Sequence, residues 1–290
     1  MNDAADAARR MWTLFEPVHV VTYFSAEARA AFEAAGLRGF WRGYFAGRSA
    51  PLGAVRAEPV TAAFFNFAPA MVSRALPGVW DLVTPGDALA ARSAGAVAAL
   101  RRLLGESPAG LRAAADGLLR AADGLDCAGR VLAAANAALP VTGDGEPAAR
   151  LWHAATLLRE HRGDGHFAAL VAADLDGCEA VVLRAGLDLS RGQMQPLRGW
   201  TDAEWDAAAA RLAERGWLDG DGRATADGVA ARRSVEDATD RAAARPWARL
   251  GAGATQELAG LLTPIARACA AQMPFPTPVG VPAPAGAPAA

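Results

Sequence analysis

The sequence contains no lysine, so all 29 of its basic side chains are arginines. The sequence also contains 31 aspartates and glutamates, so the formal net charge is -2. Because proteins that bind nucleic acid usually carry a basic excess that neutralises phosphates, we do not expect nucleic acid to be the partner. The alanine, glycine and arginine usage is typical of a high-GC genome, so a single arginine carries less weight than usual.

Cysteine is scarce, and several familiar motifs are missing. Cys127, Cys178 and Cys269 lie far apart without a CxxC pair, which argues against a disulfide framework and a thiolate zinc site. No signal peptide is visible, and no apolar run approaches the roughly 20 residues of a membrane span, so we expect a cytoplasmic protein. GxGxxG, P-loop and GxSxG motifs are absent, and the sequence identifies no cofactor.

Alanine-rich periodic segments fill most of the chain, while strand signals are few. Because alanine has the highest helix propensity, we predict a mainly α fold. Two helix starts have recognisable caps: Thr84 before Pro85, and the capping box from Thr201 to Glu204.

The two halves of the chain resemble each other on either side of a Gly/Pro-rich linker at 140–147. Similar short segments recur in the same order. The paired segments are 8–12 with 149–152, 43–46 with 165–168, and 76–80 with 197–200. We therefore predict two tandem duplicated winged-helix-like units. The first unit covers 1–142, the second covers 146–273, and a Pro/Ala-rich tail follows at 274–290.

The second unit has the features of a winged helix. A passage rich in Gly and Asp follows the predicted helix 201–216, and Asp221-Gly222 supplies a hairpin turn, which predicts a small β-wing. Helix 201–216 would be the recognition helix. It carries four acids against two arginines, however, and a helix that meets phosphates needs the opposite balance.

Six segments carry a resemblance to a known family. They are WRGYFAGRSAPLG (41–53), FFNFAP (64–69), LLREHRGDGHFAAL (157–170), RGWTDAEW (198–205), RGWLDGDGRAT (215–225) and VEDATDRAAARPWARLG (235–251). Through them the chain resembles a mainly actinobacterial family of helix-turn-helix-like proteins with degenerate winged helices. The resemblance covers nearly the whole chain and implies that fold. It implies no activity, because the family is defined by sequence and not by a reaction.

The densest polar cluster lies at 159–166, where two glycines are expected to bend the helix. Because histidine titrates near neutral pH, we predict His161 or His166 as a proton carrier. Glu160 or Asp164 would then fix the tautomer of the imidazole. The alternative is an ordinary polar loop with Asp164 as a cap.

A ligand site is predicted where the two halves face each other across one cavity. Arginines and aromatic rings there can hold a carboxylate, a phosphate or a flat ring. The alternative is an aromatic core with solvated arginines and a structural histidine. The predicted ligand-binding residues are His19, Tyr23, Arg42, Tyr44, Arg48, Phe64, Phe65, Asn66 and Arg159.

The function that follows is a small-molecule-binding protein with its pocket between the halves. Its catalytic form would be a cofactor-independent biosynthetic enzyme that uses His/Arg/Glu acid–base chemistry. One alternative is a ligand-responsive winged-helix transcription regulator, and another is an interaction module for protein partners. A third is a metal-binding protein, since the imidazoles of His19, His161 and His166 would suit zinc, copper or iron. The sequence leaves open whether the protein forms a homo-oligomer.

Overall fold

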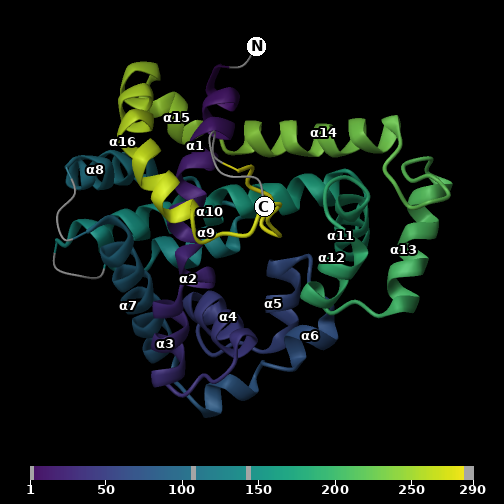
Figure 1. Cartoon of the computed structure of the whole chain (residues 1–290), viewed down its shortest axis with the longest axis horizontal. Helices are drawn as coiled ribbons and strands as arrows, with labels where there is room; N and C mark the ends of the chain where they lie inside the picture. The colour runs from purple at the N-terminus through teal and green to yellow at the C-terminus, as the bar shows by residue number, and fades with distance from the viewer. Residues whose placement is uncertain (1–2, 106–108, 142–144, 284–290) are drawn as a thin grey trace.

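The computed structural model describes residues 3–105, 109–141 and 145–283, and it confirms a mainly helical chain (Figure 1). The first part contains α1 (Asp3–His19), α2 (Val21–Phe24), α3 (Ala26–Ala34), α4 (Phe40–Ser49), η1 (Ala50–Leu52), α5 (Ala57–Phe64), α6 (Pro69–Ser73), η2 (Gly78–Asp81), α7 (Pro85–Leu104), α8 (Leu111–Ala122) and α9 (Val131–Ala137). The second part contains α10 (Pro147–Ala172), α11 (Gly177–Ala185), α12 (Arg191–Arg198), α13 (Asp202–Glu214), α14 (Ala226–Ala242), α15 (Arg245–Leu250) and α16 (Ala252–Ala270). None of the helices in these ranges is long and apolar enough to cross a bilayer.

One hydrophobic core joins the beginning and the end of the chain. α1 packs against α16, α10 and α14, and the core also takes apolar residues from α7, α8 and α15. This core therefore crosses the predicted boundary between the units. Residues 142–144 of the predicted linker and 284–290 of the predicted tail lie outside the described residues. The division into two units stays a prediction.

Helix α10 runs without a break from Pro147 to Ala172, so the predicted bend at its glycines is wrong. Gly165 has another role, because the guanidinium of Arg130 packs where its side chain would be. From there Arg130 donates to the carbonyl oxygens of His161 and Ala242. With 3.6 residues per turn, side chains five positions apart on an unbroken helix point in different directions.

Helices α11, α12 and α13 share a hydrophobic core that is separate from the one around α1. Of these, α12 and α13 form a helix-turn-helix. Ser190 and Thr201 cap α12 and α13 with the capping-box pattern, which confirms the predicted start at Thr201. Gly199 turns the chain between the two helices in the left-handed conformation, at φ 76°. Trp205 and Leu212 bury one face of α13.

The predicted β-wing is not supported, since the described residues contain no strand. Only an isolated bridge joins Leu218 and Ala224. The Asp219 side chain accepts hydrogen bonds from the backbone of Asp221 and Arg223, and the Ala224 N–H donates to Gly186 O. These donors are then not available to a longer strand pair.

The predicted duplication is not supported either. Trp80 and Trp200 should be equivalent, but the Trp80 indole donates to Val55 O, within its own half. The Trp200 indole donates to Asn66 O, in the other half. The first half packs α4–α6 around an aromatic core of its own, whereas the matching residues of the second half continue α10 and form α11 and α12.

Gly177, the first residue of α11, packs tightly against the backbone of the first half. An alanine Cβ at this position would come within 2.1 Å of the backbone oxygen of Phe65. We expect Gly177→Ala to lower the free energy of unfolding by about 1–3 kcal/mol, because backbone must move to admit the methyl group. Urea denaturation would measure the change. Gly260→Ala is the matched control: nothing lies within 4 Å of that Cβ on α16, so it should stabilise by about 0.5–1 kcal/mol.

Candidate functional site

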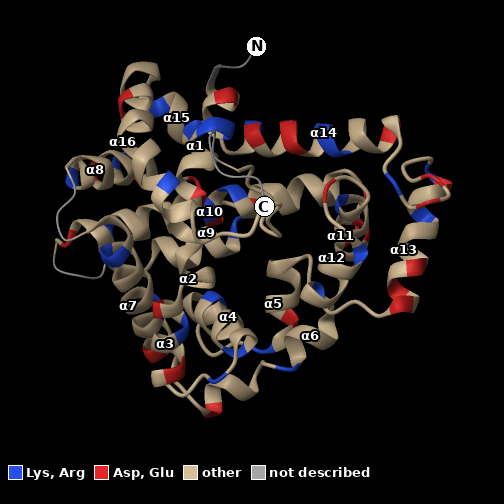
Figure 2. Cartoon of the chain, in the orientation of Figure 1, with Lys and Arg blue, Asp and Glu red and all other residues tan. Residues whose placement is uncertain are grey.

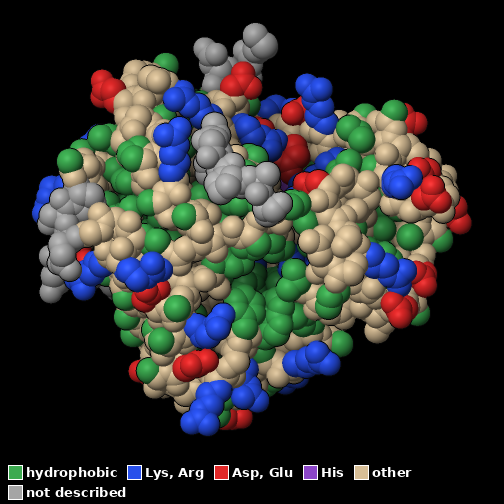
Figure 3. Space-filling view, in the orientation of Figure 1, with side chains coloured by type: hydrophobic (Ala, Val, Ile, Leu, Met, Phe, Trp, Pro, Cys, Tyr) green, Lys and Arg blue, Asp and Glu red, His purple; other side chains and the backbone are tan. Residues whose placement is uncertain are grey.

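A cavity of about 150 Å³ lies where α1, α4, α10, α11 and α12 meet, beside the end of α5. Figure 3 shows a hollow near the middle of the molecule with hydrophobic side chains around it. Six arginines line the cavity: Arg48, Arg159, Arg162, Arg184, Arg198 and Arg232. Glu16 is the one acidic residue of the lining.

Two of these arginines pair with buried carboxyl groups. Arg159 pairs with Glu160 at 2.7 Å and with Glu16 at 3.4 Å, and Arg48 reaches Glu160 at 3.4 Å. Burial alone would raise the pKa of Glu160, but the charges of Arg159 and Arg48 outweigh it and hold that pKa well below its usual range. Glu160 is therefore ionised. At Glu16 burial prevails and raises the pKa of the carboxyl.

Three more arginines have carboxylate partners at the edge of the cavity. Arg162 pairs with Glu236 at 3.2 Å and with Asp240 at 3.0 Å. Arg232 also pairs with Glu236, and Arg184 pairs with Asp188. Burial would raise the pKa of Glu236, but the surrounding positive charges, with that of Arg232 the strongest, together outweigh it and lower the pKa to about 2. Five of the six lining arginines thus have at least one carboxylate partner within the protein.

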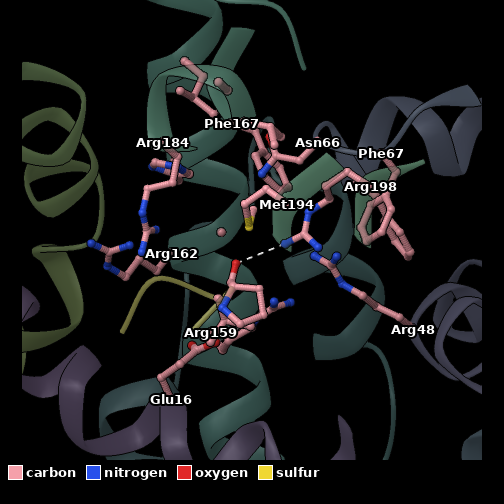
Figure 4. Close-up of a pocket in the computed structure, with 18 of the residues that line it drawn as sticks. Glu16, Arg48, Asn66, Phe67, Arg159, Arg162, Phe167, Arg184, Met194 and Arg198 are labelled. Atoms are coloured by element: carbon pink, nitrogen blue, oxygen red, sulfur yellow. Dashed lines mark hydrogen bonds and ion pairs between the residues drawn. The ribbon is translucent and has the colours of Figure 1, made fainter. Parts of the chain in front are cut away.

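Arg198 is the exception. Among the described residues it has no carboxylate partner, and its guanidinium donates only to the backbone oxygens of Leu197 at 3.3 Å and Pro278 at 3.0 Å. Its Nε is buried without a hydrogen-bond partner, as are those of Arg48 and Arg162, so the missing carboxylate is what sets Arg198 apart. Burial lowers the pKa of Arg198 from its usual value. Figure 4 shows Arg48 and Arg198 reaching the cavity from one side, and Arg162 and Arg184 from the other.

Aromatic rings hold these guanidiniums in place. Arg198 lies 4.9 Å from the ring centre of Phe67, Arg48 lies 4.1 Å from that of Phe64, and Arg162 lies 4.2 Å from that of Trp12. Such stacking fixes the plane of a guanidinium and so the direction of its donors. The cavity is consequently a preorganised set of cationic donors on an apolar wall.

The start of the predicted tail covers one side of this cavity. Pro278 and Val279 belong to the lining, while Thr277 and Val281 are buried. Phe275 packs against the core that holds α1 and α16. The described part of the tail is thus ordered by contacts with the body.

The structure brings six of the predicted site residues to the cavity. They are Tyr44, Arg48, Phe64, Asn66, Arg159 and His166. Glu160 does not line the cavity itself, but it pairs with two of the lining arginines, Arg48 and Arg159. Phe65 stands behind the wall and stacks on Phe167, with 5.5 Å between ring centres.

The other predicted residues lie elsewhere. His19 is buried, with its ring nitrogens 3.0 Å from the hydroxyls of Thr156 and Tyr23. Arg42 is exposed. Asp164 accepts from the backbone of Ala133 at 2.9 Å, and thus serves the first turn of α9.

The predicted histidine constellation does not form. His161 lies against Asp126 and Arg130, whereas His166 sits 2.9 Å from the Thr239 hydroxyl. Across the described ranges, no group of three or more His, Cys, Asp or Glu could hold a metal ion. The metal site of His19, His161 and His166 is therefore wrong, because the unbroken helix α10 sends the latter two side chains in different directions.

Several lining residues escaped the sequence analysis. Arg162 lies inside the polar cluster at 159–166 but received no role, and Arg198 begins the segment RGWTDAEW. Both residues lie in segments that carry the family resemblance, and that position was a signal for them. No signal in the sequence marked Arg184 or Arg232.

Two arginines of the helix-turn-helix, Arg191 in α12 and Arg211 in α13, are paired with acids of the same protein. Arg211 pairs with Asp176 and Glu179, both at 2.6 Å, and Arg191 pairs with Asp202 and Asp206. Figure 2 shows acidic residues along α13 and on the turn that follows it. The surface of α13 is therefore poor in free positive charge.

A protein-family model described as a helix-turn-helix family matches residues 8–276. No curated protein and no solved structure matches the chain. The matched range contains every helix that lines the cavity.

Proposed function

The chain belongs to the helix-turn-helix family that matches it over residues 8–276, and from that premise we propose that it binds a small anionic molecule in the arginine-lined cavity. The observation that carries the proposal is Arg198, a partly buried guanidinium without a carboxylate partner. A cation removed from water is costly unless it is paired. A ligand carboxylate or phosphate would supply the missing charge and accept the free donor of Arg198.

The test is a loss of anion binding in Arg198→Met. Benzoate, succinate and inorganic phosphate are titrated into the full chain by calorimetry. Removing a charge-assisted hydrogen bond should weaken binding of the preferred anion by about 10- to 100-fold. Arg198→Lys should keep part of the affinity, because the charge stays but the planar donor pair is lost.

Arg38→Met is the matched control, since Arg38 is exposed and does not line the cavity. It should bind like the unmodified chain. If none of the three anions binds, or if Arg198→Met binds them as the unmodified chain does, the proposed anion site is wrong.

Acid–base catalysis has one candidate left at the cavity from the predicted set, namely His166. Burial comes first among the causes that lower its pKa to about 3. The imidazole is therefore neutral near pH 7, but a pKa this far below the working pH makes it a weak general base there. An enzyme of this kind stays a hypothesis, and the proposal of a binding protein does not depend on it.

A ligand-responsive transcription regulator is the second candidate, and the helix-turn-helix of α12 and α13 favours it. The charge of α13 opposes it, because its Arg211 is already paired with acids of the same protein. We expect no salt-sensitive binding of random duplex DNA at micromolar protein in a gel-shift assay. Retarded DNA that is released by added salt would instead support the regulator.

A further inference from the structure

Asn66 carries an unsatisfied acceptor at the cavity, in addition to the unsatisfied Nε donors of the lining arginines. Its side-chain oxygen is buried and has no hydrogen-bond donor, and the residue belongs to the lining. A buried amide oxygen without a donor is costly. Its environment therefore favours a ligand that brings an N–H or O–H group to this oxygen.

Asn66 and Arg198 lie on neighbouring backbone segments. The Ala68 N–H donates to Arg198 O at 2.9 Å, and the Trp200 indole donates to Asn66 O at 3.1 Å. The two unsatisfied groups are thus held by the same junction between α5 and α12, and Figure 4 shows both side chains at the cavity. Both residues belong to the lining of the same cavity.

Part of the cavity lining is apolar. Phe67, Phe167 and Met194 line it, and Phe167 is held by its stacking on Phe65. An apolar cavity of about 150 Å³ in a protein holds one benzene ring, and this cavity has about that volume. The space suits one ring with short substituents.

The charge of the cavity limits the charge of the ligand. Five lining arginines are paired with protein carboxylates, and only Arg198 is left without one. A second negative charge on the ligand would have no unpaired cation within the described lining. A monoanion therefore fits better than a dianion.

We infer that the ligand is a small ring-bearing monocarboxylate with a hydroxyl or amino group. Its carboxylate binds Arg198, its ring lies against Phe67, Phe167 and Met194, and its hydroxyl or amino group donates to Asn66 Oδ1. This inference rests on the proposed anion site and adds two requirements to it, the ring and the donor.

The experiment compares benzoate with 3- and 4-hydroxybenzoate, 4-aminobenzoate, succinate and inorganic phosphate by calorimetry on the full chain. We expect at least one hydroxy- or aminobenzoate to bind about three- to tenfold more tightly than benzoate, the effect of one neutral hydrogen bond. Benzoate should in turn bind more tightly than succinate or phosphate.

Asn66→Leu separates the donor from the ring. Leucine keeps the branched shape but has no amide oxygen, so the substitution should remove the advantage of the hydroxy- or aminobenzoate over benzoate. An advantage that survives in Asn66→Leu would overturn the role of Asn66. Tighter binding of phosphate or succinate, weakened by Arg198→Met, would overturn the ring carboxylate and leave the anion site standing. No binding of any anion would overturn both.

Discussion

Glu160→Gln should lower the free energy of unfolding by about 3–5 kcal/mol, because it removes the charge that Arg48 and Arg159 share. The Glu160 side chain is 2 % exposed, so solvent cannot replace its carboxylate. Two guanidiniums would then face each other in a site of low polarity. Urea denaturation at pH 7 would measure the loss.

Glu58→Gln is the matched control for this substitution. Glu58 also pairs with an arginine, Arg56, but the Glu58 side chain is 70 % exposed. Exposed ion pairs contribute about 0–1 kcal/mol, so the control should be nearly neutral. A loss below about 1 kcal/mol for Glu160→Gln would show that the buried arginines do not depend on this carboxylate.

The free energy of unfolding should fall by on the order of 3 kcal/mol between pH 6.5 and 4.5. Burial, with the charge of Arg232, lowers the pKa of His166 to about 3, and burial with the charge of Arg130 lowers that of His161 to about 4. In the unfolded chain both titrate near 6.5. The unfolded state therefore binds more protons below pH 6.5, and folding loses stability as the pH falls towards these values.

Carboxyl groups modify this pH profile in two windows. Burial raises the pKa of Asp164 to about 6, so its protonation stabilises the folded state between about pH 6 and 4 and offsets part of the histidine effect. The lowered pKa values of Glu160 and Glu236 act below about pH 4.5, where their protonation removes stability. The steepest loss is thus expected below pH 4.5.

His166→Asn tests the histidine contribution, because an amide can keep the contact with the Thr239 hydroxyl but does not titrate. We expect the variant to lose markedly less stability between pH 6.5 and 4.5 than the unmodified chain. Urea denaturation at a series of pH values gives both profiles. Parallel profiles would contradict the assignment of acid sensitivity to His166.

The sequence predicted the starts of helices well where the signal lies within a few consecutive residues. Thr84 and Thr201 cap helices that begin where the sequence places them, since a capping box involves only a few consecutive residues. The cavity-lining segments around Tyr44 and Phe64 were also recognisable from their aromatic residues. The bend expected in α10 was wrong, because Gly165 makes room for Arg130, which is distant in sequence.

The sequence by itself determined that this chain is helical, carries a helix-turn-helix signature and concentrates its chemistry in arginines and aromatic rings, because composition and periodicity act along the chain. Only the tertiary structure decided which arginines have a carboxylate partner. Arg48 is paired across the fold with Glu160, whereas Arg198 finds only the carbonyl groups of Leu197 and Pro278. That difference depends on which carboxylates the packing of α10, α12 and α14 brings within reach of each arginine. Local sequence patterns do not specify such distances between segments that are far apart in the chain.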